Sequence, residues 1–194
     1  MQAPTLSILT PAVWSRLDAA QALAAEIRRQ AAAFPHGAVE HLVLFDDRTL
    51  SVGAKRQALA DSATGGHIAF VDDDDWVAPD YVADLLAACA PNPDVITFRQ
   101  AAVIDGVEGE IVFGAGHPDE PWVAGGVARR GPWHVCAWRR EAVAGCLFEL
   151  SNYGEDFAWV RQARGRIRFH AHIDKVLHTY RHGVTTTCAP PPGR

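Results

Sequence analysis

Apolar and polar positions along the first half of the chain fall into short buried runs that alternate with longer amphipathic runs. The short runs are rich in Val, Ile, Leu and Phe and predict strands at residues 5–10, 39–45, 67–71 and 95–103. The longer runs carry apolar residues at helical spacing and predict helices at residues 15–33, 52–63 and 80–89. Strands separated by helices of this length predict an α/β fold with a mostly parallel central sheet and helices on both faces.

Residues with special backbone properties set the expected boundaries of these elements. Pro11 is expected to stop the first strand, and Ser15 to cap the helix that follows. Gly65-Gly66 breaks the second helix, and Pro79 suits the first position of the third.

The pattern changes after residue 103. Residues 104–131 contain seven glycines, and we expect a functional loop there with one short strand at residues 110–113. Beyond it the sequence predicts helices near residues 139–144 and 155–163 and strands at 167–171 and 173–179. Residues 189–194, with three consecutive prolines, predict a disordered tail.

Composition indicates an ordinary globular protein. The chain has 194 residues, of which 48% are hydrophobic and 21% charged, so we expect one domain over residues 1–188. The four cysteines show no zinc-ligand spacing, the N-terminus lacks a basic segment, and no apolar run approaches the ~20 residues of a membrane span. These features predict reduced thiols and a cytoplasmic location, in a bacterium or in a host cell if the protein is phage-encoded.

Charge is distributed unevenly along the chain. Residues 1–128 carry a net charge of −11 and residues 129–194 carry +6. An acidic first part suits a cation site, and a basic last part suits an anionic ligand or partner.

Carboxylates follow two of the predicted strands. The second strand ends in Asp46-Asp47, the third ends in the run Asp72 to Asp75 of "HIAFVDDDDW", and the first ends in Thr10-Pro11. Because ligands of open α/β sheets bind outside the carboxyl ends of the strands, these groups are expected to share one site. Four adjacent carboxylates are either a solvated turn or a site for Mg²⁺ or Mn²⁺ that in turn holds a nucleotide diphosphate. The coincidence of three polar strand ends favours the site.

Several motifs in order resemble the family 2 glycosyltransferases of the GT-A fold. They are "TLSILTPA", "LVLFDD", the segment from "GAKRQALADSATGG" through "HIAFVDDDDWVAPDYV", and "NYGEDFAW". The aspartate motif alone is weak, but its order and spacing with GAKR and GED are specific, and the resemblance covers about residues 4 to 183. It implies a nucleotide-sugar and metal half at about residues 1–103 and an acceptor and catalytic-base half at about 104–188.

The resemblance also implies donor-site roles for individual residues. Nucleotide contacts would come from eight residues: Thr10, Pro11, Asp46, Asp47, Lys55, Arg56, Asp72 and Asp73. Metal ligands would be Asp74, Asp72 and His182, with His178 as an alternative to His182. For Lys55 and Arg56 a solvated first helical turn is the competing interpretation, and for the histidines a structural role.

For the acceptor side, the resemblance makes Asp156 the candidate general base and Glu155 the runner-up or orienting neighbour. A helix-capping turn is the competing interpretation of this pair. Acceptor-facing or lid residues would be Trp133, His134, Asp75, Tyr180 and Arg181, although Asp75 could instead cap the helix that begins at Pro79.

The implied function is a metal-dependent, inverting transfer of a sugar from a nucleotide-diphosphate donor, most simply a UDP-sugar, to an acceptor hydroxyl. The acceptor could be a glycan or a hydroxymethylated DNA base, as in small phage enzymes. Two rivals stay open. A nucleotidyltransferase would need a Gly-rich or basic loop after the first strand, which "TPAVWSRLD" does not provide, and a non-catalytic sugar-nucleotide or cation-binding module would bind without turnover.

Overall fold

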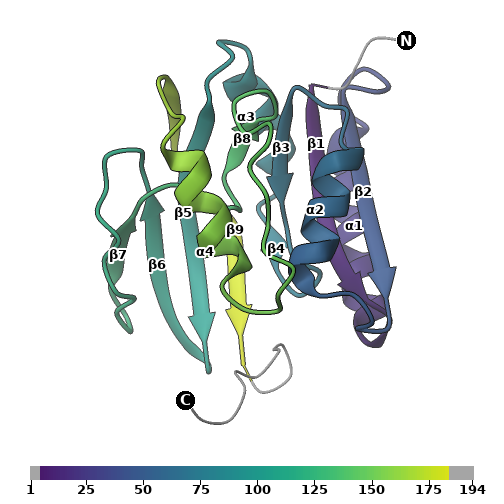
Figure 1. The fold of residues 1–194 in the computed structure, drawn as a ribbon, viewed down its shortest axis with the longest axis horizontal. Helices are drawn as coiled ribbons and strands as arrows, with labels where there is room; N and C mark the ends of the chain where they lie inside the picture. The colour runs from purple at the N-terminus through teal and green to yellow at the C-terminus, as the bar shows by residue number, and fades with distance from the viewer. Residues whose placement is uncertain (1–4, 184–194) are drawn as a thin grey trace.

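Nine strands form one continuous mixed sheet in the computed structural model, which describes residues 5–183. In chain order the strands are β1 Leu6–Val13, β2 Val39–Asp46, β3 His67–Phe70, β4 Trp76–Val77, β5 Val95–Ile104, β6 Val107–Phe113, β7 Val127–Arg130, β8 Ala137–Arg139 and β9 His170–His182 (Figure 1). The helices are α1 Leu17–Ala31, α2 Val52–Ser62, α3 Tyr81–Cys89 and α4 Glu155–Arg164, and a 3-10 turn, Trp14–Arg16, precedes α1.

The sheet is parallel at one side and mixed at the other. Its main order is β2-β1-β3-β8-β5-β6-β7, in which β2, β1 and β3 are parallel. The short β8 runs antiparallel between β3 and β5, and β6 forms an antiparallel hairpin with β5. The long β9 pairs in parallel with β5 and also pairs with β4. The predicted fold class is therefore confirmed.

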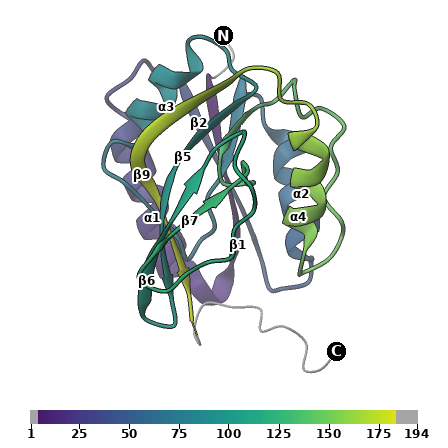
Figure 2. The same ribbon diagram turned by 90° about the vertical axis from the view of Figure 1, so that its left-hand side faces the viewer.

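Helices cover both faces of the sheet, α1 and α3 on one and α2 and α4 on the other (Figure 2). Alternating residues of the strands point to the two faces. Leu6 and Ile8 of β1 pack in the core cluster under α1 and α3, and Leu9 belongs to the cluster under α2 and α4.

Pro11 does not stop β1, contrary to expectation. The strand continues to Val13 because β3 ends at Phe70, so β1 has only β2 beside it at Pro11. The carbonyl of Leu9 accepts from the Val71 N–H, which directs Leu9, and Pro11 two residues on, toward the side that β3 has left. The missing N–H of proline therefore costs no ladder hydrogen bond.

Other predicted boundaries also differ from the structure. Ser15 lies inside the 3-10 turn and caps nothing, since no side chain caps this turn or α1. The helix expected near residues 139–144 is absent: β8 ends at Arg139, and a turn that closes at Gly145 (φ +76°) follows. The strands expected at 167–171 and 173–179 are one strand, β9.

The glycine-rich segment 104–131 is more ordered than expected. Asp105 and Gly106, both with positive φ, form the turn of the β5–β6 hairpin, and β7 then adds in parallel beside β6. The hairpin pairs residues on both sides of the expected boundary between the two halves at 103/104.

Within residues 5–183, Cys89, Cys136 and Cys146 are free and buried. No helix of this part of the chain has the length and apolar character needed to cross a membrane. Cys188 and the expected tail at 189–194 lie outside the described residues.

Candidate functional site

Two neighbouring cavities open beside the ends of the strands. The larger, of about 660 Å³, is lined by Asp72, Asp74, Asp75 and Asp156 together with Arg56, aromatic residues and the end of β9. The smaller, of about 230 Å³, is lined by Pro11, Leu50 and Lys55 among others. Arg16, Val52, Asp72 and Asn152 line both, so the two cavities adjoin.

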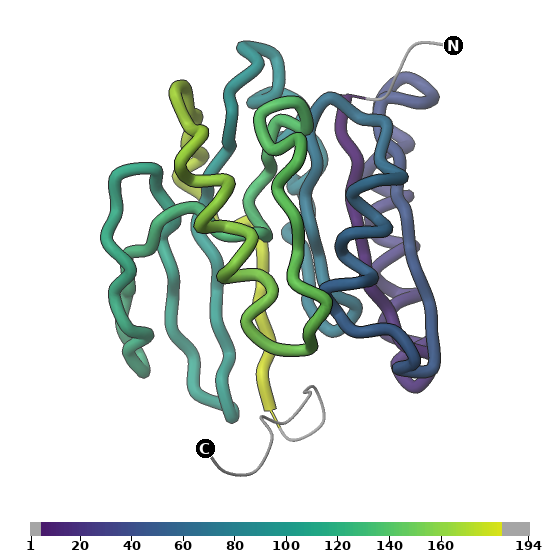
Figure 3. The backbone as a smooth tube through the Cα atoms, in the orientation of Figure 1, coloured from purple at the N-terminus to yellow at the C-terminus, as the bar shows by residue number. Residues whose placement is uncertain are grey.

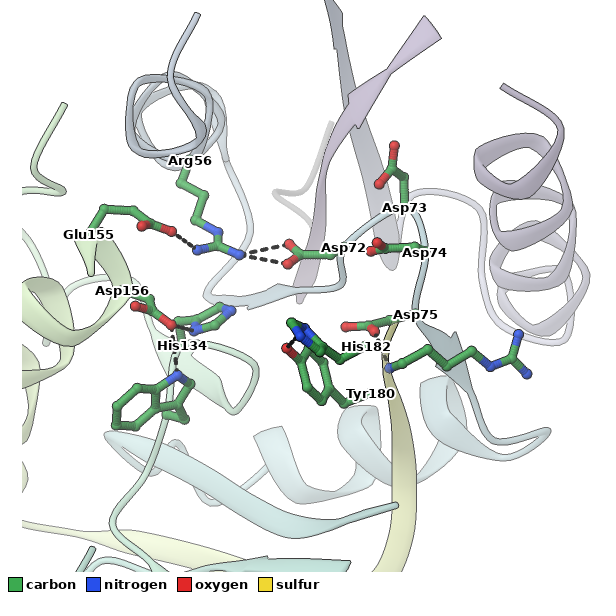
Figure 4. A network of polar contacts seen from close by, with 12 residues as sticks. Arg56, Asp72, Asp73, Asp74, Asp75, His134, Glu155, Asp156, Tyr180 and His182 are labelled. Carbon is green, nitrogen blue, oxygen red and sulfur yellow. Dashed lines mark hydrogen bonds and ion pairs between the residues drawn. The ribbon is translucent and has the colours of Figure 1, made fainter. Parts of the chain in front are cut away.

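Of the four aspartates after β3, Asp72, Asp74 and Asp75 point to one side and Asp73 points away from them (Figure 4). Asp73 is fully buried, accepts from the Val13 N–H at 2.9 Å and pairs with Arg16, and it lines neither cavity. Asp72, Asp74 and Asp75 all line the larger cavity. The run, called the aspartate loop below, therefore has three carboxylates on one cavity, while Asp73, expected to contact the nucleotide, is bound to Val13 and Arg16.

These three carboxylates have different electrostatic environments. Burial and the neighbouring Asp72 raise the pKa of Asp74 to about 7, against the pull of Arg16, whose Nη1 lies 3.1 Å from Asp74 Oδ2. Burial and the charges of Asp72 and Asp74 raise the pKa of Asp75 well above its ordinary value. For Asp72 the effect of burial is outweighed by the Arg56 guanidinium, so its pKa is lowered.

Asp75 is tied to β9 rather than to α3. Its Oδ1 accepts from the Arg181 backbone N–H at 3.0 Å, and its Oδ2 lies 3.4 Å from His178 Nε2. The expected alternative of capping the helix after Pro79 is wrong, since no side-chain cap is present at the start of α3.

Arg56 joins the aspartate loop to the start of α4. Its guanidinium donates to both oxygens of Asp72, at 2.9 and 2.7 Å, and to Glu155 (Figure 4). Arg56 and Glu155 are both buried, and burial together with Asp156 raises the pKa of Glu155 despite the Arg56 charge. Arg56 is thus occupied by two carboxylates from opposite sides of the larger cavity.

The position of Arg56 follows from local features of α2. Ser51 caps the helix by accepting from the Ala54 N–H at 3.2 Å, and the Val52 N–H donates to Asn152 Oδ1 at 2.9 Å. The Gly53 N–H donates to the Ser151 carbonyl at 3.0 Å. Figure 3 shows the segment between β8 and α4 coming down to this end of α2.

Asp156 lies in the first turn of α4 with both oxygens in hydrogen bonds. Oδ2 accepts from Trp133 Nε1 at 3.0 Å and lies 3.4 Å from His134 Nδ1, and Oδ1 accepts from the Phe157 N–H at 2.7 Å. Burial opposes its charge, but His134, Arg56 and the Trp133 N–H keep the pKa of Asp156 below its ordinary value. Asp156 is therefore an ionised carboxylate beside the cavity, as a general base requires.

The last residues of β9 form another wall of the larger cavity. Tyr180, Arg181 and His182 all line it, and Tyr180 Oη lies 3.3 Å from His182 Nδ1. The expected lid is thus part of a strand that pairs with β5 as far as His182. The alternative ligand His178 is fully buried, with Nδ1 2.9 Å from Gln100 Nε2.

The expected nucleotide residues near β1 and β2 are only partly brought together. Pro11 and Lys55 line the smaller cavity. Thr10 is fully buried, with Oγ1 3.0 Å from His41 Nε2, and Asp46 is bound to Lys55 Nζ at 2.7 Å. Asp47 is exposed. Thr10, Asp46 and Asp47 line neither cavity.

Several cavity residues were not predicted from the sequence. They are Arg16, Arg48, Leu50 and Val52 around the first helices, Gln100, Ile111, Phe113 and Arg130 on the hairpin side, and Asn152, Tyr153 and Phe157 around the start of α4. Arg16 lies directly after β1, and a basic residue at the carboxyl end of a strand could have been predicted from the sequence as a site residue. The residues on the hairpin side reach the site through the pairing of β6 with β5 and with β7, which no local pattern indicates.

The donor set suits Mg²⁺ or Mn²⁺ in part. Among residues 5–183 no group of three or more His, Cys, Asp and Glu side chains is arranged to hold a metal ion. Mg²⁺, however, is usually held by one or two carboxylates together with substrate phosphates. Asp74, with Asp72 beside it, presents hard oxygen ligands whose mutual repulsion a divalent cation would relieve.

Comparisons with known proteins agree with this architecture. The family model described as Glycosyl transferase family 2 matches residues 26–148, which include the aspartate loop and end before Glu155. No curated protein matches the chain.

Solved structures of S. aureus TarS have a similar fold. One has a TM-score of 0.68 at 15% identity over 91% of this chain and 36% of that chain. TarS 1-349 in complex with UDP has a TM-score of 0.67 at 14% identity, over 91% of this chain and 60% of that chain. The complex with UDP-GlcNAc has a TM-score of 0.63 at 12% identity, over 94% of this chain and 60% of that chain. The present chain thus spans between about a third and three-fifths of the TarS chains that it matches. With the family model covering more than half of its length, the chain belongs to glycosyl transferase family 2.

Proposed function

We propose that the protein transfers a sugar from a nucleotide-diphosphate donor, a UDP-sugar, to an acceptor hydroxyl with inversion at the anomeric carbon. The observation that carries the proposal is that Asp156 and the carboxylates after β3 line one cavity of about 660 Å³. Asp156, which can take a proton, therefore shares one cavity with carboxylates that can support a diphosphate through a metal ion. The cavity is large enough to admit a sugar. TarS structures with bound UDP and UDP-GlcNAc support the choice of donor.

The donor would extend from the smaller cavity into the larger one. The nucleobase of the donor would lie against Pro11 and Leu50 in the smaller cavity. The diphosphate would lie near Arg16 and Asp72, which line both cavities. Arg56 is already paired with Asp72 and Glu155, so it orients these carboxylates rather than binding the diphosphate. Asp46 is likewise paired with Lys55 and orients that lysine.

Asp74 and Asp72 would hold Mg²⁺ or Mn²⁺, with His182 as a further ligand from β9. When bound, such a cation neutralises the negative charge that develops on the departing diphosphate. Asp73, which is bound to Val13 and Arg16, holds the loop in place instead.

Asp156 would act as the general base. Its carboxylate takes the proton of the acceptor hydroxyl while that oxygen forms a bond to the anomeric carbon and the bond from this carbon to the diphosphate oxygen breaks. The pKa of Asp156 is lowered, so the group is unprotonated at neutral pH. Glu155 is bound to Arg56 and is a positioning residue in this scheme.

The acceptor would enter past the aromatic residues of the larger cavity. Trp133 and Phe157 lie with ring centroids 6.1 Å apart, and Tyr153 is 77% exposed beside them. Flat aromatic faces suit both a sugar ring and a nucleobase, so a glycan and a hydroxymethylated DNA base stay the two predicted acceptors.

Release of UDP from UDP-sugars tests the proposal. UDP-glucose, UDP-galactose and UDP-GlcNAc would be incubated with wild type, Asp156→Asn and the matched control Asp174→Asn, an exposed aspartate of β9, with and without Mn²⁺. We expect metal-dependent release that falls about 10²- to 10⁴-fold in Asp156→Asn and is unchanged in the control. NMR of the product should show the inverted anomer.

The rivals predict other outcomes. UDP binding without release under any condition would favour a non-catalytic module. Release of pyrophosphate from UTP and a sugar phosphate would indicate a nucleotidyltransferase.

A further inference from the structure

A second polar cluster lies at the C-terminal end of α4, whereas Asp156, the proposed general base, lies in the first turn of this helix. It consists of Arg164 in the last turn of the helix, Asp119 in the segment between β6 and β7, and the indole of Trp133. We infer that Arg164 and Asp119 position Asp156 through Trp133, which makes Arg164 and Asp119 positioning residues for the transfer. The inference rests on the proposed function, because it assumes that Asp156 is the base.

Trp133 connects the two ends of α4. Its Nε1 donates to Asp156 Oδ2 at 3.0 Å, and the Arg164 guanidinium carbon lies 5.2 Å from its ring centroid. Asp156 and Arg164 are eight residues apart, about 12 Å along a helix, which an indole and a guanidinium together can span. The tryptophan is thus held at one end by a cation over its ring and bonded at the other to the base.

Arg164 is itself fixed by three hydrogen bonds to the segment before Trp133. Nη1 and Nη2 donate to the two oxygens of Asp119, at 2.6 and 3.0 Å, and Nε donates to the Pro132 carbonyl at 2.8 Å. Asp119 Oδ1 also accepts from the Gly131 N–H at 3.1 Å. A bidentate pair of this kind sets the plane of the guanidinium as well as its position.

Gly131 makes room for this arrangement. A Cβ at Gly131 would lie 2.8 Å from Cζ of Arg164, closer than such contacts occur. The backbone of Trp133 is also held in place, since its carbonyl accepts from Trp138 Nε1 at 2.9 Å and from the Cys136 N–H at 3.0 Å. The backbone of Trp133 is therefore held by hydrogen bonds, and one face of its indole is covered by the Arg164 guanidinium.

The consequence for Asp156 is geometric. Its Oδ1 is bonded to the Phe157 N–H and its Oδ2 to Trp133, so the two donors together set the plane of the carboxylate. Without Arg164 the indole loses the group over its ring, and one of these two donors is no longer fixed. Misplacement of a catalytic group by about 1 Å can cost 10²-fold in rate, so a distant arginine can change turnover without touching substrate.

The test uses Arg164→Met and Asp119→Asn, with Arg166→Met as the matched control. Arg166 lies just beyond α4 and donates to the Ala144 carbonyl, away from Trp133. The first readout is the indole N–H resonance of Trp133 in ¹⁵N-labelled protein, assigned by its loss in Trp133→Phe. In Arg164→Met and Asp119→Asn we expect this resonance to move toward the position of a solvated indole and its hydrogen to exchange faster, with no change in the control.

The second readout is UDP release from the best UDP-sugar. We expect kcat to fall about 10- to 100-fold in Arg164→Met, less in Asp119→Asn, with KM for the donor within about twofold of wild type. An unchanged resonance and unchanged kcat in both variants, or a change in KM alone, would overturn the inference. Should Arg164→Met fail to fold, Asp119→Asn decides by the same criteria.

Asp156→Asn separates this inference from the proposed function. Full turnover in Asp156→Asn would reject Asp156 as the base and with it the proposed mechanism. A Trp133 resonance that moves in Asp156→Asn and in Arg164→Met would still show that the arginine positions this carboxylate through the indole.

Discussion

At the scale of single residues, four adjacent aspartates take different places because their neighbours come from different parts of the chain. Asp73 meets Arg16 and the end of β1, Asp75 meets the backbone of β9, and Asp72 meets Arg56 from α2. Only Asp74 combines cavity lining with a pKa raised to about 7. Burial and charge, rather than residue type, therefore distinguish the four carboxylates, and Asp74, beside Arg16, is the one that gains most from a divalent cation.

Residue types and their order predicted that the carboxylates after β3 and Asp156 lie near one another, but not that Asp46 and Asp47 line neither cavity, nor which carboxylates are already paired. Arg56 and Glu155 are 99 positions apart, and their ion pair appears only when α2 and α4 pack on the same face. Likewise the partner of Thr10 is His41 on the neighbouring strand. Such pairings depend on strand register and helix placement, which local patterns do not encode.

Asp94 gives a prediction for the pH dependence of stability. Burial would raise its pKa, but Arg139 and the N–H groups of Phe169 and Arg168 lower the pKa to about 2. Because the folded pKa lies below that of the unfolded chain, this stabilisation is present above about pH 4 and is lost as the pH falls toward 2.

Urea unfolding of wild type and Asp94→Asn measures this effect. We expect the variant to lose about 1–3 kcal/mol in free energy of unfolding at pH 7, and the difference from wild type to shrink as the pH falls below about 4. Asp61→Asn, on the exposed side of α2, serves as the control. A difference between Asp94→Asn and wild type that stays constant down to about pH 2 would contradict the assignment.

At the scale of elements, the site depends on the approach of α2 to the segment that precedes α4. The helices α1, α2, α3 and α4 and the strands β2, β3 and β5 were predicted close to their observed positions, whereas β9, the longest strand, was predicted as two strands. The two-residue β4, the short β7 and the short β8 were missed, because they carry too little periodicity and, unlike the equally short β3, belong to no recognisable buried run. Of these three, β8 pairs with both β3 and β5 and so connects the two sides of the sheet.

Gly53 permits the close approach of α2, and its replacement gives an element-scale prediction. A Cβ there would lie 1.8 Å from the Glu149 carbonyl oxygen and 3.1 Å from Glu155 Cβ. Gly53→Ala should therefore push α2 and the Glu155 turn apart, lowering the free energy of unfolding by about 1–3 kcal/mol and reducing UDP release.

Gly165→Ala is the matched control for Gly53→Ala. Its φ of −64° suits alanine, and the nearest contact of the added carbon is Gln162 O at 3.7 Å. We expect this variant to be neutral or stabilised by about 0.4–1 kcal/mol in thermal or urea unfolding. Equal behaviour of the two variants would show that the contact between α2 and the Glu155 turn is not tight.

At the scale of the whole molecule, part of the charge asymmetry of the sequence is neutralised by ion pairs within the fold. Basic residues of the last third pair with acidic residues of the first part: Arg139 with Asp94, Arg164 with Asp119, and Lys175 with Asp80 and Asp84. These three basic residues are therefore structural partners of the acidic part. Net charge along the chain is accordingly a weak argument for a nucleic-acid acceptor.

The central claim is that the carboxylates that follow β3, at the carboxyl ends of the parallel strands, form a metal-dependent site for a nucleotide diphosphate. Calorimetric titration of UDP into wild type, Asp74→Asn and the control Asp174→Asn, each with and without Mn²⁺, tests it most directly. The account predicts that Mn²⁺ strengthens UDP binding at least about tenfold, or about 1.4 kcal/mol, in wild type and in the control but not in Asp74→Asn. UDP binding that is absent, or that is the same with and without Mn²⁺ in all three proteins, would contradict it.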